Sequence, residues 1–331
     1  MNWRRYAGLI LAALIALGAT SAQAADRFTL GTNPQGTIYY TIGGAIAAAL
    51  QDKLGKKVTV QPYTGSSVYL PLIAVGDVSM GLNSSLDLGE ARSGGFGKEA
   101  RNLRVLARLW PLNVALVARR DLGISKIAEL KGKRVVTELS ALKAMSRLSK
   151  TILNLGGLDV KDVKAVTVAG LGPGMQQLTE NNLDATLIAV GIPLTKQAQA
   201  SIPGGIRYLS ITGKGATTEK AEAAFPGTYL TTIKPTPRLP EVTEPVTVAS
   251  FDVFLTATPN MSDADAAAIV EALYDSLPQL KKSYPPLARA SQAKLSAPSN
   301  TVPYHPGAVA FFKKKNMWSK ANAAHDAGLM H

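Results

Sequence analysis

The sequence of residues 30–40 is Leu30-Gly31-Thr32-Asn33-Pro34-Gln35-Gly36-Thr37-Ile38-Tyr39-Tyr40, and Thr41-Ile42-Gly43-Gly44-Ala45-Ile46 follows directly. It predicts a short apolar strand, a loop rich in glycine and proline, and a helix that begins near residue 37. Apolar residues recur every three or four positions from 38 to 50, as on one face of a helix. The start of such a helix offers free N–H groups and a partial positive charge, which suit a carboxylate or phosphate. An ordinary turn capped by Thr37 explains the stretch equally well.

The first 24 residues have the pattern of a secretory signal peptide. Arg4 and Arg5 precede an apolar run over 7–19, and Ala22-Gln23-Ala24 forms an A-x-A cleavage site. The apolar run is too short for a permanent membrane anchor, and no similar run follows it. We therefore expect an exported, soluble chain that is cut after Ala24, resides in the periplasm, and makes no stable membrane insertion.

Composition restricts the classes of function. The chain has no cysteine, which excludes disulfides and thiolate metal sites. Its net charge of +13 falls to +11 when the two arginines of the expected signal are removed. That charge fits an anionic partner, but the lysines are scattered, so nucleic acid is not an expected partner. No motif indicates a metal or a cofactor.

Small polar residues follow three successive predicted strands of the first half. They lie at 31–37, at 64–67 after the strand 57–62, and at 83–85 after the strand 78–82; Ser66 or Ser67 would cap a helix reaching about residue 75. In open α/β sheets, ligands bind beyond the carboxyl ends of the strands. We expect these three segments to meet at one binding edge.

The same pattern begins again in the second half. Residues 72–81 contain a helix end, a turn with an aspartate and a strand. Residues 178–187 repeat this pattern, and Gly191-Ile192-Pro193 follows their strand. Two similar lobes with matched strand ends predict a cleft between them. Strands are expected over 103–109 and 114–118, separated by Trp110-Pro111-Leu112-Asn113, and another over 246–255. The clearest helix starts at a Ser262 cap.

At this level the sequence resembles the TAXI family of periplasmic solute receptors, which serve tripartite ATP-independent periplasmic (TRAP) transporters. The resemblance covers nearly the whole chain after the signal. It rests on the first stretch, Thr64-Gly65-Ser66, residues 103–111, Leu130-Lys131-Gly132-Lys133-Arg134-Val135, Gly191-Ile192-Pro193 and Val302-Pro303-Tyr304-His305-Pro306-Gly307-Ala308.

The resemblance implies an α/β fold of two lobes, the type II clamp of periplasmic binding proteins, in which each lobe is a sheet flanked by helices. Residues 25–112 with 246–331 would form lobe 1, residues 113–245 lobe 2, and crossings near 112–118 and 245–255 the hinge. The clamp would close on a small organic anion, an amino acid or a carboxylate, and deliver it to TRAP membrane subunits. The positions carried over to the site are Gly31, Thr32, Gly36, Thr37, Tyr39, Thr64, Gly65, Ser66 and Asn83 in lobe 1, with Gly191 and Pro193 in lobe 2; we add Ser84 from the third strand end.

One segment departs from the family pattern. A glycine-rich loop is usual after the Lys-Gly-Lys-Arg-Val strand, whereas this chain has Ser140-Ala141-Leu142-Lys143-Ala144-Met145. Our hypothesis is that Lys143, with Arg147 one turn later, pairs with a second charged group of the ligand. Solvation of a helix face is the alternative for both. Tyr229 could lay its ring against the ligand or simply pack at the surface.

Other functions remain open at this stage. The same clamp could serve an ABC importer or a sensor kinase. Ser140 and Lys143 match the S-x-x-K of exported serine enzymes, but no S-D-N or K-T-G follows, so we do not expect an enzyme. We expect His305 to make a structural contact rather than to act as a base.

Overall fold

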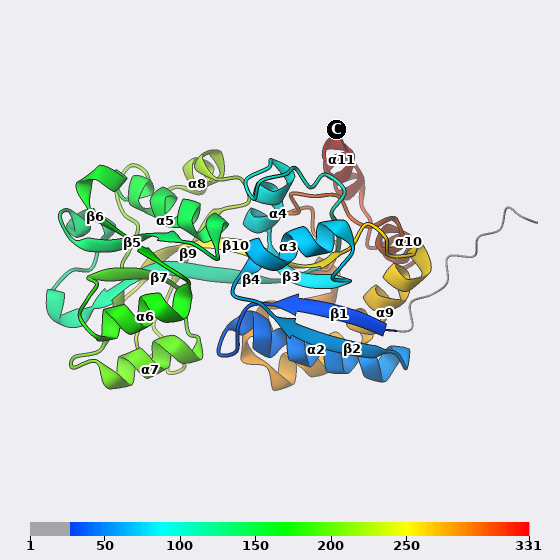
Figure 1. Ribbon diagram of the computed structural model, residues 1–331, viewed down its shortest axis with the longest axis horizontal. Helices are drawn as coiled ribbons and strands as arrows, with labels where there is room; N and C mark the ends of the chain where they lie inside the picture. The colour runs from blue at the N-terminus through cyan, green and yellow to red at the C-terminus, as the bar shows by residue number, and fades with distance from the viewer. Residues whose placement is uncertain (1–26, 331) are drawn as a thin grey trace, which may run out of the picture.

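The computed structural model describes residues 27–330, so the expected signal peptide lies outside the described residues. Figure 1 shows two groups of elements along the longest axis, joined by the strands β4 (Arg104–Arg119) and β10 (Val246–Ala257). The expected α/β fold of two lobes with two crossings is confirmed. Within the described range, no helix is both long and apolar enough to cross a membrane.

The first lobe contains the parallel strands β1 (Arg27–Thr32), β2 (Lys57–Pro62) and β3 (Met80–Ser84). Its helices are α2 (Ile38–Leu54), α3 (Ser66–Val75), α4 (Ser85–Arg92), α9 (Asp263–Ser283), α10 (Pro306–Lys314) and α11 (Lys320–Gly328), with the 3-10 helices η5 (Pro285–Arg289) and η6 (Gln292–Lys294).

The second lobe contains the strands β5 (Arg134–Leu139), β6 (Lys164–Val168), β7 (Ala185–Ala189), β8 (Ile206–Tyr208) and β9 (Tyr229–Ile233). Its helices are α5 (Lys143–Leu155), α6 (Leu171–Thr179), α7 (Pro193–Ser201) and α8 (Thr218–Ala224), with the 3-10 helices η2 (Arg120–Leu122), η3 (Ile127–Leu130) and η4 (Val160–Asp162).

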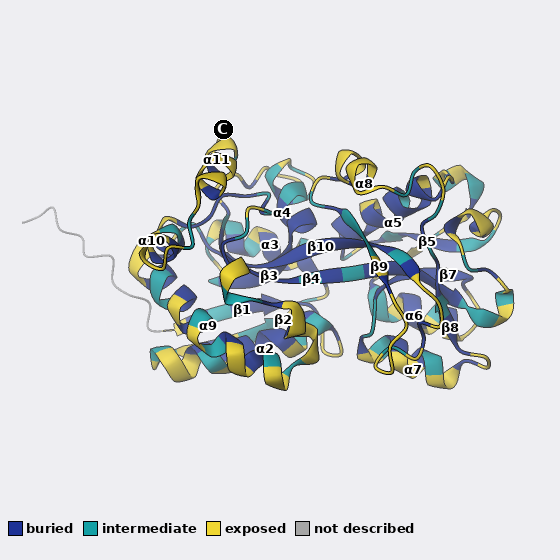
Figure 2. Ribbon diagram, turned by 180° about the vertical axis from the view of Figure 1, so that it is seen from behind, coloured by how far each residue is buried: buried dark blue, intermediate teal, exposed yellow. Residues whose placement is uncertain are grey.

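The sheets of the two lobes are continuous through the crossing strands. The order is β2-β1-β3-β10-β4-β7-β5-β6, with β9 paired to β10 and β8 to β4. Every residue of β10 except Thr247 is buried, and Figure 2 shows these central strands in the colour of buried residues. The core therefore extends through both lobes along β4 and β10.

The expected break in the first crossing was wrong, because β4 is one strand from Arg104 to Arg119. Pro111 lacks the N–H that a central strand needs. The ladder absorbs it near an irregularity: Pro111 lies opposite Asp252, and the register shifts between Val253 and Phe254. Pairing of β4 with β7 begins only at Val114, so β4 has a partner on one side alone at Pro111, where a proline is tolerated as on an edge strand.

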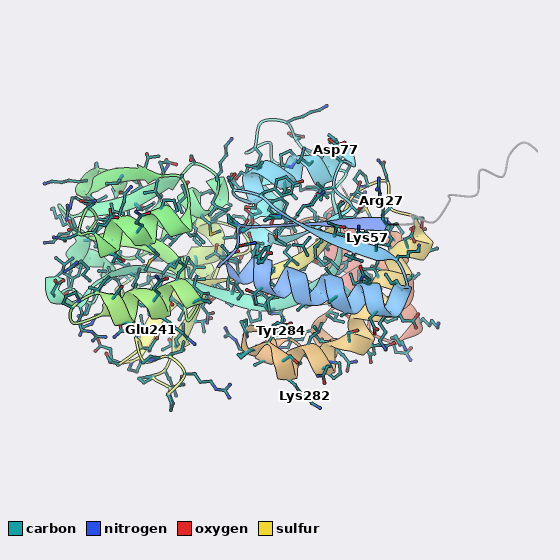
Figure 3. All side chains as sticks on the ribbon, turned by 60° about the horizontal axis from the view of Figure 1, so that its bottom comes forward. Arg27, Lys57, Asp77, Glu241, Lys282 and Tyr284 are labelled. Carbon is teal, nitrogen blue, oxygen red and sulfur yellow. The ribbon has the colours of Figure 1, made fainter. Side chains whose placement is uncertain are left out.

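The carboxyl ends of the parallel strands point toward the opposite lobe. In lobe 1, Arg27 and Lys57 pair at the start of β1 and β2, and Figure 3 shows both at the end of the molecule away from lobe 2. Helix α2 then starts at its Thr37 cap and ends at Gly55, which adopts a φ of 64°. Helix α3 reaches Val75 as expected, but the expected cap at Ser66 or Ser67 was wrong, because Gly65 takes that position and the helix begins with Ser66. Ser262 caps α9 as expected. This arrangement brings the helix starts of both lobes to one interface.

Candidate functional site

Helix starts from both lobes line a small central cavity. With the lobes in this contact its volume is about 40 Å³, enough for about three water molecules, so a larger ligand requires the lobes to lie further apart. Thr37 caps α2 and Ser66 begins α3 on the side of lobe 1. On the side of lobe 2, Leu142 and Ile192 cap α5 and α7, and Leu171 begins α6. Because each helix start carries a partial positive charge, five of them around one cavity favour a negatively charged group there.

The polar side chains that line the cavity all come from lobe 1. They are Asn33, Thr37, Tyr39, Ser66 and Asp87. Thr37 donates its hydroxyl to the carbonyl of Pro34 at 2.6 Å and accepts the N–H of Tyr40 at 3.4 Å. The Tyr39 ring contacts Trp110 edge-on, with ring centroids 6.1 Å apart.

Asp87 is the charged residue of the cavity. Its Oδ1 accepts from the hydroxyl of Ser66 at 2.7 Å, and its Oδ2 accepts from the N–H and the hydroxyl of Ser84 at 3.2 and 2.6 Å. Burial raises the pKa of the Asp87 carboxyl, while the hydrogen bonds from the two serines act to lower it. The carboxylate also completes a capping box at the start of α4, so it is held in place by its own helix.

Several buried polar atoms behind this wall have no protein partner within residues 27–330. They are Oγ1 of Thr32, Oδ1 of Asn33, and both amide atoms of Asn83. Asn33 also lines the cavity. Since buried polar groups are nearly always hydrogen-bonded, the carboxyl ends of β1 and β3 have room for waters or ligand atoms as partners.

Contacts between the lobes close over the cavity. The backbone N–H of Lys143 donates to Oγ of Ser67 at 2.9 Å, and Oγ of Ser85 donates to the carbonyl of Gly227 at 3.3 Å. Gly65 packs so tightly against the carbonyl oxygen of Ala141 that a Cβ would collide with it. The two lobes are thus in direct contact next to the cavity.

Three of the lobe 1 positions expected in the site line the cavity, and the others do not. Thr37, Tyr39 and Ser66 line it, while Thr32, Asn83 and Ser84 are buried behind it. Gly31 lies against Tyr69, where a Cβ would come within 2.8 Å of the ring. Gly36 forms the turn before α2 with a φ of 84°, Gly65 contacts lobe 2, and Thr64 is exposed.

The expected cations lie elsewhere. The structure places neither Lys143 nor Arg147 among the residues that line the cavity. Lys143 is exposed at the start of α5. Arg147 pairs with Glu90 of lobe 1, donates to the carbonyl of Ala224 at 3.2 Å, and lies 4.3 Å from the centre of the Phe225 ring.

Two larger grooves flank the cavity between the lobes. One, of about 980 Å³, includes Gly191 and Pro193 and shares Ile38, Leu112 and Ile192 with the cavity wall. The N–H of Gly191 donates to the hydroxyl of Tyr208 at 3.1 Å. The other groove, of about 620 Å³, includes Arg147 and Tyr229. Tyr229 donates its hydroxyl to Asp252 at 3.2 Å, and burial raises the pKa of this phenol.

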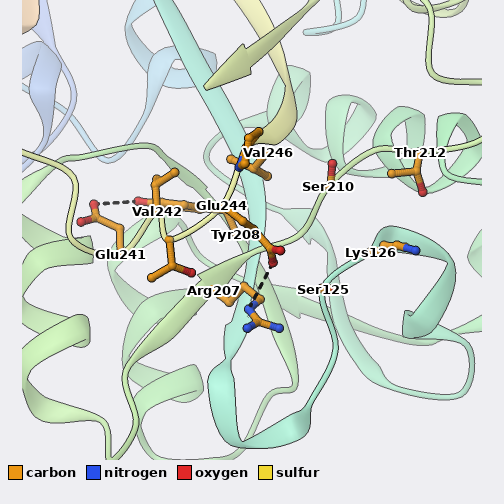
Figure 4. Close-up of a pocket in the computed structure, with 12 residues that line it drawn as sticks. Ser125, Lys126, Arg207, Tyr208, Ser210, Thr212, Glu241, Val242, Glu244 and Val246 are labelled. Atoms are coloured by element: carbon orange, nitrogen blue, oxygen red, sulfur yellow. Dashed lines mark hydrogen bonds and ion pairs between the residues drawn. The ribbon is translucent and has the colours of Figure 1, made fainter. Parts of the chain in front are cut away.

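A further pocket, of about 170 Å³, lies within lobe 2 and its crossing strand (Figure 4). Tyr208 donates to Glu241 at 3.2 Å, and Arg207 lies 4.0 Å from Glu244. These charges compensate each other, and apart from Val246 at the start of β10 the wall of this pocket comes from lobe 2. It is therefore a weaker candidate for a site that lobe closure controls.

The residues weighed for catalysis are apart from the cavity. Ser140 is exposed, and its backbone N–H donates to the carbonyl of Val168 at 3.0 Å. His305 is buried as the cap of α10, where Nδ1 accepts from Gly307 and Nε2 contacts the carbonyl of Met261. The expected structural role of His305 is confirmed. Within residues 27–330, no cluster of three or more His, Asp or Glu side chains suits a metal ion.

Sequence reasoning selected three of the fourteen wall residues, Thr37, Tyr39 and Ser66, and missed the others. Asp87 had a signal, because Ser84 and Asp87 form an S-x-x-D capping pattern that starts at the third strand end. Asn33 lay within the first stretch but was not selected. Leu142 and Met145 line the cavity beside the selected Lys143, and their apolar spacing gave no reason to separate them from the core.

This fold, of two lobes joined by two strands with a cavity between them, is the fold of periplasmic binding proteins. The chain belongs to the NMT1-like family, whose sequence model matches residues 30–315.

Solved structures of this class share the fold at low sequence identity. The periplasmic binding protein BugD matches with a TM-score of 0.59 and 16% identity, over 92% of this chain and 99% of that one. MatC from Rhodopseudomonas palustris with bound malate matches with a TM-score of 0.57 and 16% identity, over 92% of this chain and 99% of that one. PhnD1 from Prochlorococcus marinus in complex with methylphosphonate matches with a TM-score of 0.55 and 11% identity, over 88% of this chain and 99% of that one.

Proposed function

We propose that this chain is a periplasmic receptor whose two lobes close on a small organic anion. The observation that carries the proposal is the convergence of five helix starts from both lobes on one enclosed cavity. Solved neighbours with bound malate and methylphosphonate, both small anions, support it. The proposed mechanism is a conformational change without a covalent step. A ligand that touches both lobes stabilises the closed state more than the open one.

In this proposal, lobe 1 comprises residues 25–112 and 246–331, and lobe 2 comprises residues 113–245. The crossing strands β4 and β10 act as the hinge, because they are the segments that pass between the lobes. Thr37, Tyr39 and Ser66 contact the ligand, with Asn33 beside them. The anionic group is held by N–H groups at the helix starts rather than by a cationic side chain.

A thermal-shift screen of the chain from residue 25 tests this function. The compounds are amino acids, mono- and dicarboxylates, and small sulfonates and phosphonates. A true ligand at 100 times its Kd should stabilise the folded chain by about 2.7 kcal/mol. Stabilisation by one class of anion, lost in Ser66→Ala, supports the proposal. No stabilisation by any of these anions would contradict it.

The delivery partner is a separate part of the proposal. Following the family resemblance, we propose a TRAP permease driven by an ion gradient, with an ABC importer or a sensor kinase as the alternative, since the fold serves all three. Uptake of the identified ligand into vesicles that hold the cognate permease distinguishes them. Uptake that needs an ion gradient and no ATP supports TRAP delivery, and uptake that needs ATP contradicts it.

A further inference from the structure

The two walls of the central cavity differ in chemistry. The wall from lobe 1 carries all the polar side chains, including Asn33 and Asp87. The wall from lobe 2 is apolar throughout, and the crossing strands add only apolar side chains to it. A ligand enclosed here meets hydrogen-bonding groups on one side and hydrocarbon on the other. The apolar wall from lobe 2 consists of Leu142, Met145, Leu171, Ala189 and Ile192.

Donors for an anion are also concentrated in lobe 1. The first N–H groups of α2 and α3 have no partner within their own helices, as at any helix start. In lobe 2, the first N–H of α5, from Lys143, already donates to Ser67. Helices α6 and α7 each have a proline in the first turn, Pro173 and Pro193, so both offer fewer N–H groups. The anionic group of a ligand is therefore best held at the start of α2, because Ser66 at the start of α3 already donates to the Asp87 carboxylate.

A second anionic group would find no counter-charge. Within residues 27–330, no lysine, arginine or histidine lines the cavity, and its one charged residue is the negative Asp87. Arg147 is engaged by Glu90, and Lys143 is exposed. A second carboxylate would have to leave water and face the apolar wall of lobe 2 without a counter-charge, which is unfavourable.

We propose that the ligand carries a single anionic group and an aliphatic body, with the anionic group toward lobe 1 and the aliphatic body against lobe 2. This inference rests on the function proposed above and names the class of its ligand. An ammonium group on the ligand is compatible with it, because such a group can lie beside Asp87.

Two matched pairs of compounds test the inference by isothermal titration of the chain from residue 25. Leucine is compared with glutamate, and isocaproate with glutarate; each pair differs in whether the far end is aliphatic or anionic. In the pair that binds, we expect the aliphatic member to bind at least about tenfold more tightly, the range for small apolar groups in an apolar pocket. If leucine and glutamate bind more tightly than isocaproate and glutarate, an ammonium group beside Asp87 contributes to the affinity.

The outcomes separate this inference from the function on which it rests. If glutamate or glutarate binds as tightly as its aliphatic counterpart, the inference is wrong while the receptor function stands. If none of the four binds and every other anion of the screen also fails, the receptor function itself is wrong. If only sulfonates or phosphonates bind, the same comparison is made with aliphatic and anionic members of that series.

A variant pair tests the role of the lobe 2 wall. Met145→Lys places a cation on the apolar wall, and Lys143→Met removes the exposed cation two residues earlier. We expect Met145→Lys to narrow or reverse the preference for leucine over glutamate, and Lys143→Met to leave it unchanged. A loss of preference in Lys143→Met would overturn the assignment. If Met145→Lys fails to fold, the ligand pairs on the natural chain still decide.

Discussion

The buried ion pair between Arg108 and Asp252 joins the two crossing strands. Nη2 of Arg108 lies 2.6 Å from Oδ1 of Asp252, and each side chain is 8% exposed. Asp252 also accepts hydrogen bonds from Tyr229 and Ser299, at 3.2 and 2.6 Å. The pair therefore connects β4, β9, β10 and the segment that precedes α10.

We predict that Asp252→Ala lowers the free energy of unfolding by about 3–5 kcal/mol, because it leaves the buried Arg108 without a counter-charge. Asp121→Ala is the control, since Asp121 is 48% exposed in its pair with Arg119 and should cost about 1 kcal/mol or less. Urea unfolding of both variants gives the values. Equal small losses would show that the buried pair does not stabilise the crossing.

His305 gives a prediction for pH. Burial lowers the pKa of its imidazole, with smaller opposing effects from the Met261 carbonyl and Asp263. As the pH falls, His305 therefore becomes protonated at a higher pH in the unfolded chain than in the folded chain. The contribution of neutral His305 to the free energy of unfolding should be fully present above about pH 6.5. It should be lost as the pH falls from there toward the lowered pKa.

His305→Asn is the matched variant, because asparagine keeps an acceptor at the cap of α10 and does not titrate. We expect the loss of stability between about pH 7 and pH 5 to be smaller in His305→Asn than in the natural chain. Urea midpoints at the two pH values measure it. Identical losses in both chains would assign the pH dependence to other groups.

Helices α5 and α4 are tied across the lobes by Arg147 and Glu90, whose side chains are 47% and 14% exposed. We predict that Arg147→Ala favours the open state, so that the radius of gyration of the ligand-free chain increases in small-angle scattering. Affinity should then fall by a similar factor for every ligand, because the closed state is less populated.

Lys150→Ala is the control for Arg147→Ala, because Lys150, one turn further along α5, pairs with Glu138 of the same lobe. It should leave the radius of gyration and the affinity unchanged. If Arg147→Ala weakens only ligands with two anionic groups, then Arg147 contacts the ligand, as the sequence hypothesis had it, and the role in closure is wrong.

Elements with strong local signals could be predicted from the sequence. The caps at Thr37 and Ser262 and the helix from Ser66 to Val75 depend on neighbouring residues alone. The continuity of β4 could not be predicted, because Pro111 lies where β4 is paired on one side only, with a strand that comes about 140 residues later.

The candidate site could be predicted only in part for a similar reason. The strand ends of lobe 1 follow from local patterns, and Thr37, Tyr39 and Ser66 do line the cavity. Which side chains of α5 face lobe 1 depends on how the lobes meet. That contact turns Leu142 and Met145 inward and leaves Lys143 outside, and no local pattern carries that information.

At the level of the whole molecule, the central claim is that ligand binding closes the lobes over the cavity. The absence of cysteine allows two labels to be placed without background. Exposed Asp52, near the end of α2, and exposed Lys161, in η4, lie in different lobes. Cysteines at these positions report the distance between the lobes.

Single-molecule energy transfer between these labels, with and without the tightest-binding compound of the screen, tests the claim most directly. We predict a shift of the population toward a shorter distance, with a midpoint at the Kd from titration. A distance distribution that stays the same at saturating ligand would contradict closure of the lobes on a bound anion.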